Sequence, residues 1–150
     1  PDMLPSVALN AAACVIVWPS QQAPTATSAA DSDRDSDILV ATSRDNGATW
    51  GPPTVLLSEM TQDWSQDKSP RVTVSSSGRW LVAWASENSL AGRVGGDMDV
   101  LVVESSNNGT SWSQPKALFS DANNVGVYNH ATEVFAVAVD GQTLAGFDSF

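Results

Sequence analysis

The segment SRDNGATW at residues 43–50 returns as SSNNGTSW at residues 105–112, and this repetition decides the fold that the sequence predicts. The first serine, the central glycine and the tryptophan are the same in both copies, whereas Asn107 replaces Asp45. Asp and Asn side chains accept hydrogen bonds from nearby backbone amides, and glycine adopts the positive φ that tight turns require. The segment therefore predicts a tight turn between two β-strands that the chain uses twice.

The similarity extends upstream of both turns, so the repeated unit is much longer than the turn itself. DSDILVATS (35–43) matches DMDVLVVES (97–105), and VIVWPS (15–20) matches LVAWAS (81–86). A third copy begins near the C-terminus, where VAVDGQTLAGF (137–147) matches the first half of the second unit. Internal repetition over units of about 60 residues indicates a propeller, a solenoid or another repeat array.

Each complete unit contains four short apolar runs that are typical of β-strands. Val, Leu, Ile and Trp dominate the runs, and Gly, Asn, Asp, Ser and Pro separate them. The two middle runs are apolar on both faces, as expected for strands that neighbouring sheets cover on both sides. The predicted fold class is all-β, a β-propeller of four-stranded antiparallel blades. The expected blades are 1–58, 59–120 and the first half of a third at 121–150.

About two and a half blades do not close a ring, so apolar strands would remain open at both flanks. We therefore expect further blades of a longer chain, or other copies of this chain, as partners. The repeat also predicts that equivalent tryptophans share one environment. Trp18 should match Trp84, and Trp50 should match Trp112.

The repeated turn resembles a known motif. Its pattern, S-x-D-x-G-x-T-W, is similar to the Asp box, or BNR repeat, of sialidases and related propellers, and the stretch 80–112 resembles the tandem units of bacterial secreted sialidase-like proteins. The resemblance implies a secreted or cell-surface propeller in which these turns are structural and lie away from the active site. The residues with this structural role are Ser43, Asp45, Gly47, Thr49 and Trp50, and Ser105, Asn107, Gly109, Ser111 and Trp112.

Composition excludes two classes of partner. The chain has 150 residues, a formal net charge of −10, and 42% hydrophobic residues. An acidic surface repels nucleic acid and anionic membranes, and no apolar run is long enough to cross a bilayer. We expect neither nucleic-acid binding nor membrane insertion, and a glycan or protein ligand instead.

Acidic residues mark the ends of the long loops, which should lie on the face opposite the repeated turns. Long loops on a rigid scaffold commonly carry function. Alternating carboxylates resemble an oxygen-rich Ca²⁺ site, although the EF-hand pattern is absent. The alternative is a solvated acidic loop without metal. The candidate ligands are Asp31, Asp33, Asp35, Asp37, Asp97 and Asp99.

The resemblance also sets a requirement for catalysis. Sialidases hold the substrate carboxylate with three arginines and add a Tyr nucleophile, a Glu and an Asp. The arginines of this chain do not recur in register between the units. We therefore assign no catalytic residue and expect a non-catalytic binding or structural module. The alternative is a part of an exo-α-sialidase whose catalytic residues lie mostly outside this segment.

Overall fold

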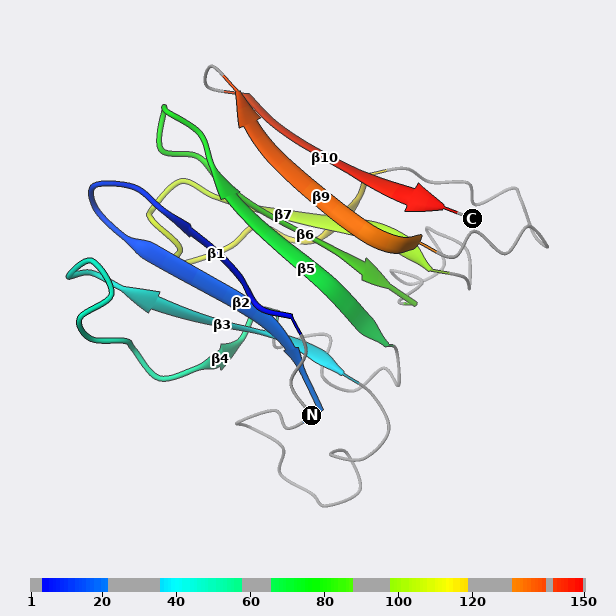
Figure 1. Cartoon of the computed structure of the whole chain (residues 1–150), viewed down its shortest axis with the longest axis horizontal. Helices are drawn as coiled ribbons and strands as arrows, with labels where there is room; N and C mark the ends of the chain where they lie inside the picture. Colours follow the sequence, from blue (N-terminus) through cyan, green and yellow to red (C-terminus); the bar gives the residue numbers. More distant parts are fainter. Residues whose placement is uncertain are drawn as a thin grey trace.

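The computed structural model describes residues 4–21, 36–57, 66–87, 98–118, 131–139 and 142–149. All regular structure in these residues is β-strand, and none of them forms a helix that could span a membrane. The strands form three antiparallel sheets that follow one another along the chain (Figure 1).

The first two sheets have four strands each, in sequential order. The first contains β1 (Ser6–Leu9), β2 (Cys14–Ser20), β3 (Asp37–Ser43) and β4 (Thr54–Val55). The second contains β5 (Asp67–Val74), β6 (Trp80–Ser86), β7 (Asp99–Ser105) and β8 (Lys116–Ala117). The third is a pair made of β9 (Ala131–Val139) and β10 (Gln142–Ser149).

Strand register shows that the first two sheets are built alike. Trp18 lies opposite Leu39 in the first sheet, and Trp84 lies opposite Leu101 in the second. The inner strands agree as well, since Val7 pairs with Ile16, and Val72 pairs with Val82. The alignment of the two sequence units therefore corresponds to equivalent positions in space.

The sheets pack face to face. Strand β5 packs against β1, β2 and β3, and β9 packs against β5, β6 and β7 (Figure 1). One core lies between the first two sheets. It contains Ala13, Val15, Val17, Ile38, Val40 and Leu56 from the first, and Val72, Trp80, Val82, Trp84, Leu101 and Val103 from the second.

Strand β6 is buried along its whole length because both of its faces are covered. Its tryptophans belong to the core shared with the first sheet, whereas Ala83 and Ala85 form a second cluster with Val100 on the other face. Strand β9 packs against β6. The continuous apolar run of β6 is typical of a strand that is buried on both faces.

Direct hydrogen bonds also join the first two sheets. The amide of Val72 donates to Oγ of Ser6 at 3.1 Å, between the inner strands β5 and β1. At one end of the sheets the amide of Asp67 donates to the carbonyl of Ser36 at 2.9 Å. The hydroxyl of Ser36 donates back to the carbonyl of Asp67 at 2.6 Å. The inter-sheet contact is therefore both apolar and hydrogen-bonded.

The expected equality of the tryptophan environments is wrong. Trp84 is fully buried whereas Trp18 is half-buried, and Trp112 packs against the core whereas Trp50 is 42% exposed. The physical reason is position in the stack. The first sheet covers one face of the second, and among the described residues no sheet covers the corresponding face of the first.

Candidate functional site

The turn at 43–50 follows β3 and is closed by its own side chains. The hydroxyl of Ser43 donates to Oδ1 of Asp45 at 2.7 Å and accepts from the amide of Gly47 at 2.8 Å. The amide of Thr49 donates to the same Oδ1 at 2.8 Å, and its hydroxyl donates to Oδ2 of Asp45 at 2.5 Å. Gly47 has a φ of +87°, which glycine adopts without steric cost. Both carboxylate oxygens of Asp45 are thus used inside the turn.

These hydrogen bonds control the charge of Asp45. The bond from the Thr49 hydroxyl, then the Thr49 amide and the Ser43 hydroxyl, lower the pKa of Asp45 from 3.8 to about 2. Donors aimed at a carboxylate favour its ionised form. A group with such a pKa is a poor general acid near neutral pH. The geometry therefore suits a structural carboxylate.

The turn at 105–112 has the same design with an amide in place of the carboxylate. Ser105 donates to Oδ1 of Asn107 at 2.8 Å, and this oxygen also accepts from the amide of Ser111 at 3.0 Å. The Nδ2 group of Asn107 donates to Oγ of Ser111 at 2.8 Å, which reverses the direction of the equivalent bond in the first turn. An amide therefore completes the turn, and a negative charge is not required there.

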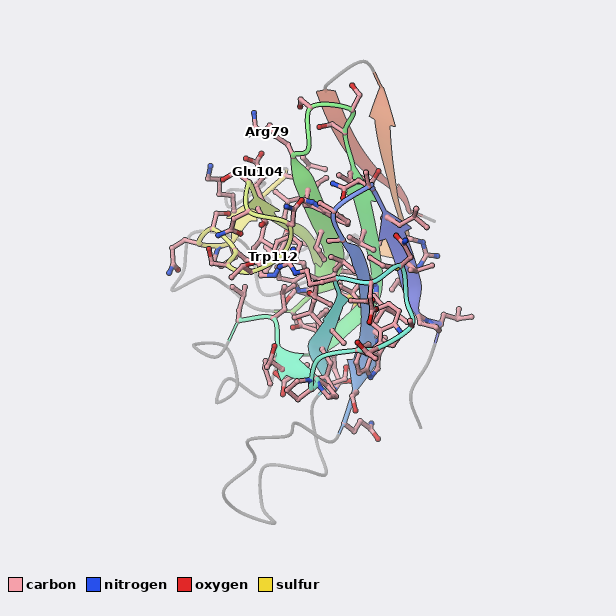
Figure 2. All side chains as sticks on the ribbon, turned by 90° about the vertical axis from the view of Figure 1, so that its left-hand side faces the viewer. Arg79, Glu104 and Trp112 are labelled. Carbon is pink, nitrogen blue, oxygen red and sulfur yellow. The ribbon has the colours of Figure 1, made fainter. Side chains whose placement is uncertain are left out.

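Each arginine among the described residues bonds to a different partner. Arg44 donates to Oγ1 of Thr110 at 2.7 Å, and Arg71 donates to the carbonyl of Pro70 at 3.0 Å. Arg79 forms an ion pair with Glu104 at 2.5 Å (Figure 2). Arg34 and Arg93 lie outside the described residues. Within the described part of the chain, these bonds do not bring the arginines to one shared ligand.

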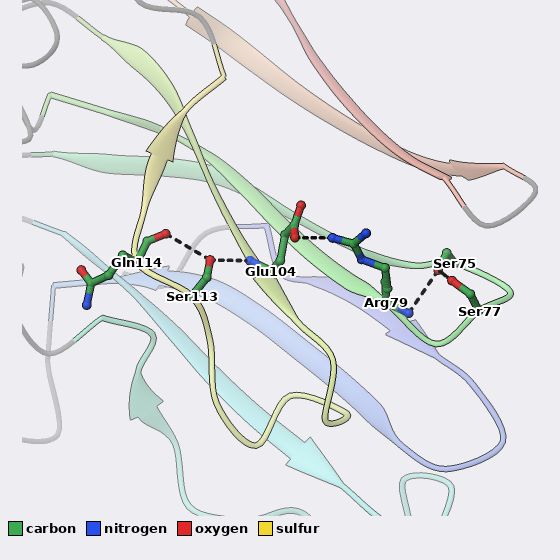
Figure 3. A network of polar contacts seen from close by, with 6 residues as sticks. All are labelled: Ser75, Ser77, Arg79, Glu104, Ser113 and Gln114. Carbon is green, nitrogen blue, oxygen red and sulfur yellow. Dashed lines mark hydrogen bonds and ion pairs between the residues drawn. The ribbon is translucent and has the colours of Figure 1, made fainter.

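The Arg79–Glu104 pair belongs to a chain of polar contacts across the second sheet (Figure 3). The amide of Arg79 donates to Oγ of Ser75 at 3.1 Å, and the amide of Glu104 donates to Oγ of Ser113 at 3.1 Å. The two charged side chains are 59% and 43% exposed. Exposed ion pairs add little to stability, so this ion pair contributes little to the stability of the fold.

The acidic positions predicted from the sequence lie at the end of the sheets that is opposite to the repeated turns. Asp37 begins β3 opposite Ser20, and Asp99 begins β7 opposite Ser86, so the two carboxyls are equivalent. Each is 9% exposed. In the described ranges no three acidic, His or Cys side chains are placed to hold a metal. The remaining candidates, Asp31, Asp33, Asp35 and Asp97, lie outside the described residues.

A small pocket lies between the first two sheets at this end. Its lining includes Asp37, Asp67 and Trp84, together with the apolar segment 55–57. It has room for about one water molecule. Trp84 is fully buried, and in the described part of the chain its Nε1 has no hydrogen-bond partner. The pocket suits a bridging water and is too small for a sugar.

Asp67 is an acidic residue of this pocket that is not among the ligands predicted from the sequence. It begins β5 in the second unit, on a different strand from the repeated loop acids. The signal for it is its alignment with Asp2 at the start of the first unit. That alignment places the residue on an inner strand, but it does not reveal that Asp37 of the preceding sheet lines the same pocket.

Solved structures of carbohydrate-active enzymes share this architecture. A Hadza microbial sialidase matches with a TM-score of 0.57 and 19% identity, over 77% of this chain and 25% of that chain. The alpha-L-arabinanase of Penicillium chrysogenum, solved with arabinobiose, matches with a TM-score of 0.60 and 15% identity, over 91% of this chain and 35% of that one. The chain has a sialidase-like β-propeller fold. The prediction of an all-β propeller is thereby confirmed, and the two four-stranded sheets are propeller blades.

The likeness lies in the fold. A sialidase of Trypanosoma rangeli also matches, with a TM-score of 0.50 and 19% identity, over 78% of this chain and 20% of that chain. No family model matches the sequence, and no curated protein matches it either. The propeller segment spans between 20% and 35% of the length of these three structures.

Proposed function

We propose that this chain is a non-catalytic segment of a secreted or cell-surface propeller that binds a glycan or protein ligand at its long-loop end. The observation that carries the proposal is that the three described arginines bond to three separate partners. Arg44, Arg71 and Arg79 are bonded to a hydroxyl, a backbone carbonyl and a carboxylate. A site for the carboxylate of sialic acid would need such groups to converge.

The charge of the long-loop end favours a neutral ligand. Asp37, Asp67 and Asp99 lie at this end of the strands, and the whole chain has a net charge of −10. These carboxylates are buried, so the repulsion of an anionic sugar comes from the net negative charge of the chain, unless a cation reverses the sign of the charge. Sugar hydroxyls, in contrast, donate readily to carboxylate oxygens. The arabinanase neighbour was solved with arabinobiose, a neutral sugar, which supports this choice.

A bound cation is the second part of this proposal. Ca²⁺ prefers carboxylate and carbonyl oxygens, and it would allow the same acidic end to bind a negatively charged ligand. The equivalent positions of Asp37 and Asp99 on neighbouring blades support a repeated contribution to such a site.

Part of an exo-α-sialidase is the other candidate function, because sialidases are among the structural neighbours. In that case the catalytic residues would lie mostly outside this segment. The two candidates differ in a direct measurement on the native polypeptide. The non-catalytic module should bind a neutral oligosaccharide in a calorimetric titration and release no sialic acid from a fluorogenic sialoside.

Sialoside hydrolysis by the native polypeptide would overturn the non-catalytic proposal. Three variants then locate the chemistry: Arg44→Ala, Arg71→Ala and Arg79→Ala. Hydrolysis that survives all three would assign the activity to residues elsewhere in the polypeptide. Hydrolysis that is lost in one of them, with the fold intact by circular dichroism, would place an active arginine in this segment.

A further inference from the structure

The small pocket at the long-loop end lies at the interface between the first two blades. Asp37 and the segment 55–57 line it from the first blade, whereas Asp67 and Trp84 line it from the second. Asp37 is 9% exposed and Asp67 is 6% exposed. Each blade therefore places one buried acidic group against the same small space.

Backbone contacts fix the position of both acids. The amide of Asp67 donates to the carbonyl of Ser36 at 2.9 Å, and the hydroxyl of Ser36 donates to the carbonyl of Asp67 at 2.6 Å. Ser36 and Gln66 also form a parallel β-bridge between the two blades. Asp37 follows Ser36 directly in the chain, so the same contact holds the start of β3 beside the start of β5.

Trp84 adds a hydrogen-bond donor to this lining. Its side chain is fully buried, and among the described residues its Nε1 has no hydrogen-bond partner. Buried donors are normally satisfied by a protein group or by an ordered water, because an unmade bond costs free energy. Trp80 shows the usual arrangement, since its Nε1 donates to Oδ1 of Asn108 at 3.4 Å. Trp84 therefore requires an acceptor, and the pocket is a space that it lines.

The chemistry of the lining selects the class of ligand. An indole N–H group only donates, whereas ionised carboxyl groups only accept. A metal cation offers no acceptor to the indole, and an anion would be repelled by the carboxylates. Water accepts from one group and donates to two, and buried waters typically make about three hydrogen bonds. The room for about one water molecule agrees with this choice.

We propose that the pocket is a binding site for one structural water that joins the first two blades. The water accepts a hydrogen bond from Nε1 of Trp84 and donates to the carboxyl groups of Asp37 and Asp67. Its two hydrogens lie between the acids, so the acidic groups of neighbouring blades can line one space. A Ca²⁺ ion at the acidic end of the sheets would therefore bind outside this pocket.

Water-selective NMR on the native polypeptide, labelled with ¹⁵N at its indole groups, tests the proposal. The Nε1 proton of Trp84 should give a nuclear Overhauser cross-peak to water, and the sign of this peak in the rotating frame separates a bound water from hydrogen exchange. Trp80 is the matched control, because it is equally buried but donates to Asn108. Its indole should give no such cross-peak. The variants Trp84→Phe and Trp80→Phe assign the two resonances.

Removal of one acceptor provides a second readout. Asp67→Leu keeps a branched side chain of similar length that cannot accept a hydrogen bond, so the Trp84 cross-peak should be lost. Asp45→Asn removes a carboxylate from the first turn, at the other end of the sheets, and should leave the Trp84 cross-peak unchanged.

Three results would overturn the proposal. The absence of a Trp84 cross-peak in the native polypeptide would show that the pocket is dry, and this measurement decides even if Asp67→Leu fails to fold. A cross-peak that persists in folded Asp67→Leu would remove Asp67 from the site. Loss of the cross-peak when Ca²⁺ replaces EDTA would assign the pocket to a cation instead of a water.

Discussion

At the scale of single residues, Asp45 makes the first turn sensitive to acid. Its pKa in the folded state is about 2, below the value of 3.8 that the free side chain has. The ionised group therefore stabilises the fold above about pH 3.8, and this contribution is lost as the pH falls through about 2. We expect Asp45→Asn to reduce the pH dependence of urea unfolding in this window and to change stability little at neutral pH.

The second turn provides the matched control for this prediction. Asn107 does not titrate, and its amide completes the same turn. The variant Asn107→Asp should add a second acid-sensitive step in the same pH window, because Ser105 and Ser111 would stabilise the new carboxylate. An unchanged pH profile in both variants would show that the turn hydrogen bonds do not set this titration.

The two turn glycines should respond differently to the same substitution. Both have positive φ, so alanine at either position carries a conformational cost of about 1 kcal/mol. Only at Gly109 does the new methyl group also meet Val15, at 3.0 Å. We expect Gly109→Ala to lower the free energy of unfolding more than Gly47→Ala does, as measured by chemical denaturation.

A double variant separates strain from packing at this position. Val15→Ala removes the methyl groups that a side chain at residue 109 would meet. The combination Gly109→Ala with Val15→Ala should therefore cost less than the sum of the two single changes. Strict additivity, or an equal loss for Gly47→Ala and Gly109→Ala, would contradict the inter-blade role of the second turn.

At the scale of strands, the position of a sheet in the stack decides how much equivalent side chains contribute to the free energy of unfolding. Trp84 on β6 is fully buried between two sheets, whereas Trp18 on β2 is half-buried. Truncation of a buried Trp leaves a cavity and costs about 3–5 kcal/mol. Trp84→Ala should therefore destabilise the 150-residue chain by about this amount, and Trp18→Ala by clearly less. Equal losses in chemical denaturation would mean that the face of the first sheet that carries Trp18 is covered in solution.

At the scale of the whole molecule, acidic positions of both blades lie at the end that is opposite to the repeated turns. If they bind Ca²⁺, the folded state gains stability as RT ln(1 + [Ca²⁺]/Kd), with a Kd of about 10⁻⁴–10⁻³ M for a weak site. Thermal unfolding should therefore occur at higher temperature in millimolar Ca²⁺ than in EDTA. Asp37→Asn and Asp99→Asn should reduce this difference, and Glu104→Gln, near the other end of β7, should leave it unchanged.

An identical unfolding temperature in EDTA and in Ca²⁺ would reject the metal and leave a hydrated acidic end. A difference that persists in both Asp variants would place the ion elsewhere in the molecule. The comparison between Asp37→Asn and Asp99→Asn also shows whether the two blades contribute equally to the site, as their equivalent register positions predict.

The sequence alone was sufficient for the features that depend on near neighbours. The side-chain hydrogen bonds that close each turn join residues at most four positions apart, and strand alternation depends on the same short range. Comparison of the two units was enough to align strand with strand. These features could be predicted because a local segment contains every group that forms them.

The tertiary structure decided which of two equivalent residues is covered. The amides of Asn10 and Asn108 meet across 98 positions of the chain, and Asp37 lines one pocket with Asp67 and Trp84 of the next blade. Trp50 and Trp112 stand at matching places in the repeat, yet Trp50 is exposed and Trp112 packs against the core. The burial of a residue depends on whether a neighbouring sheet covers it, and the local sequence around the residue does not include that sheet.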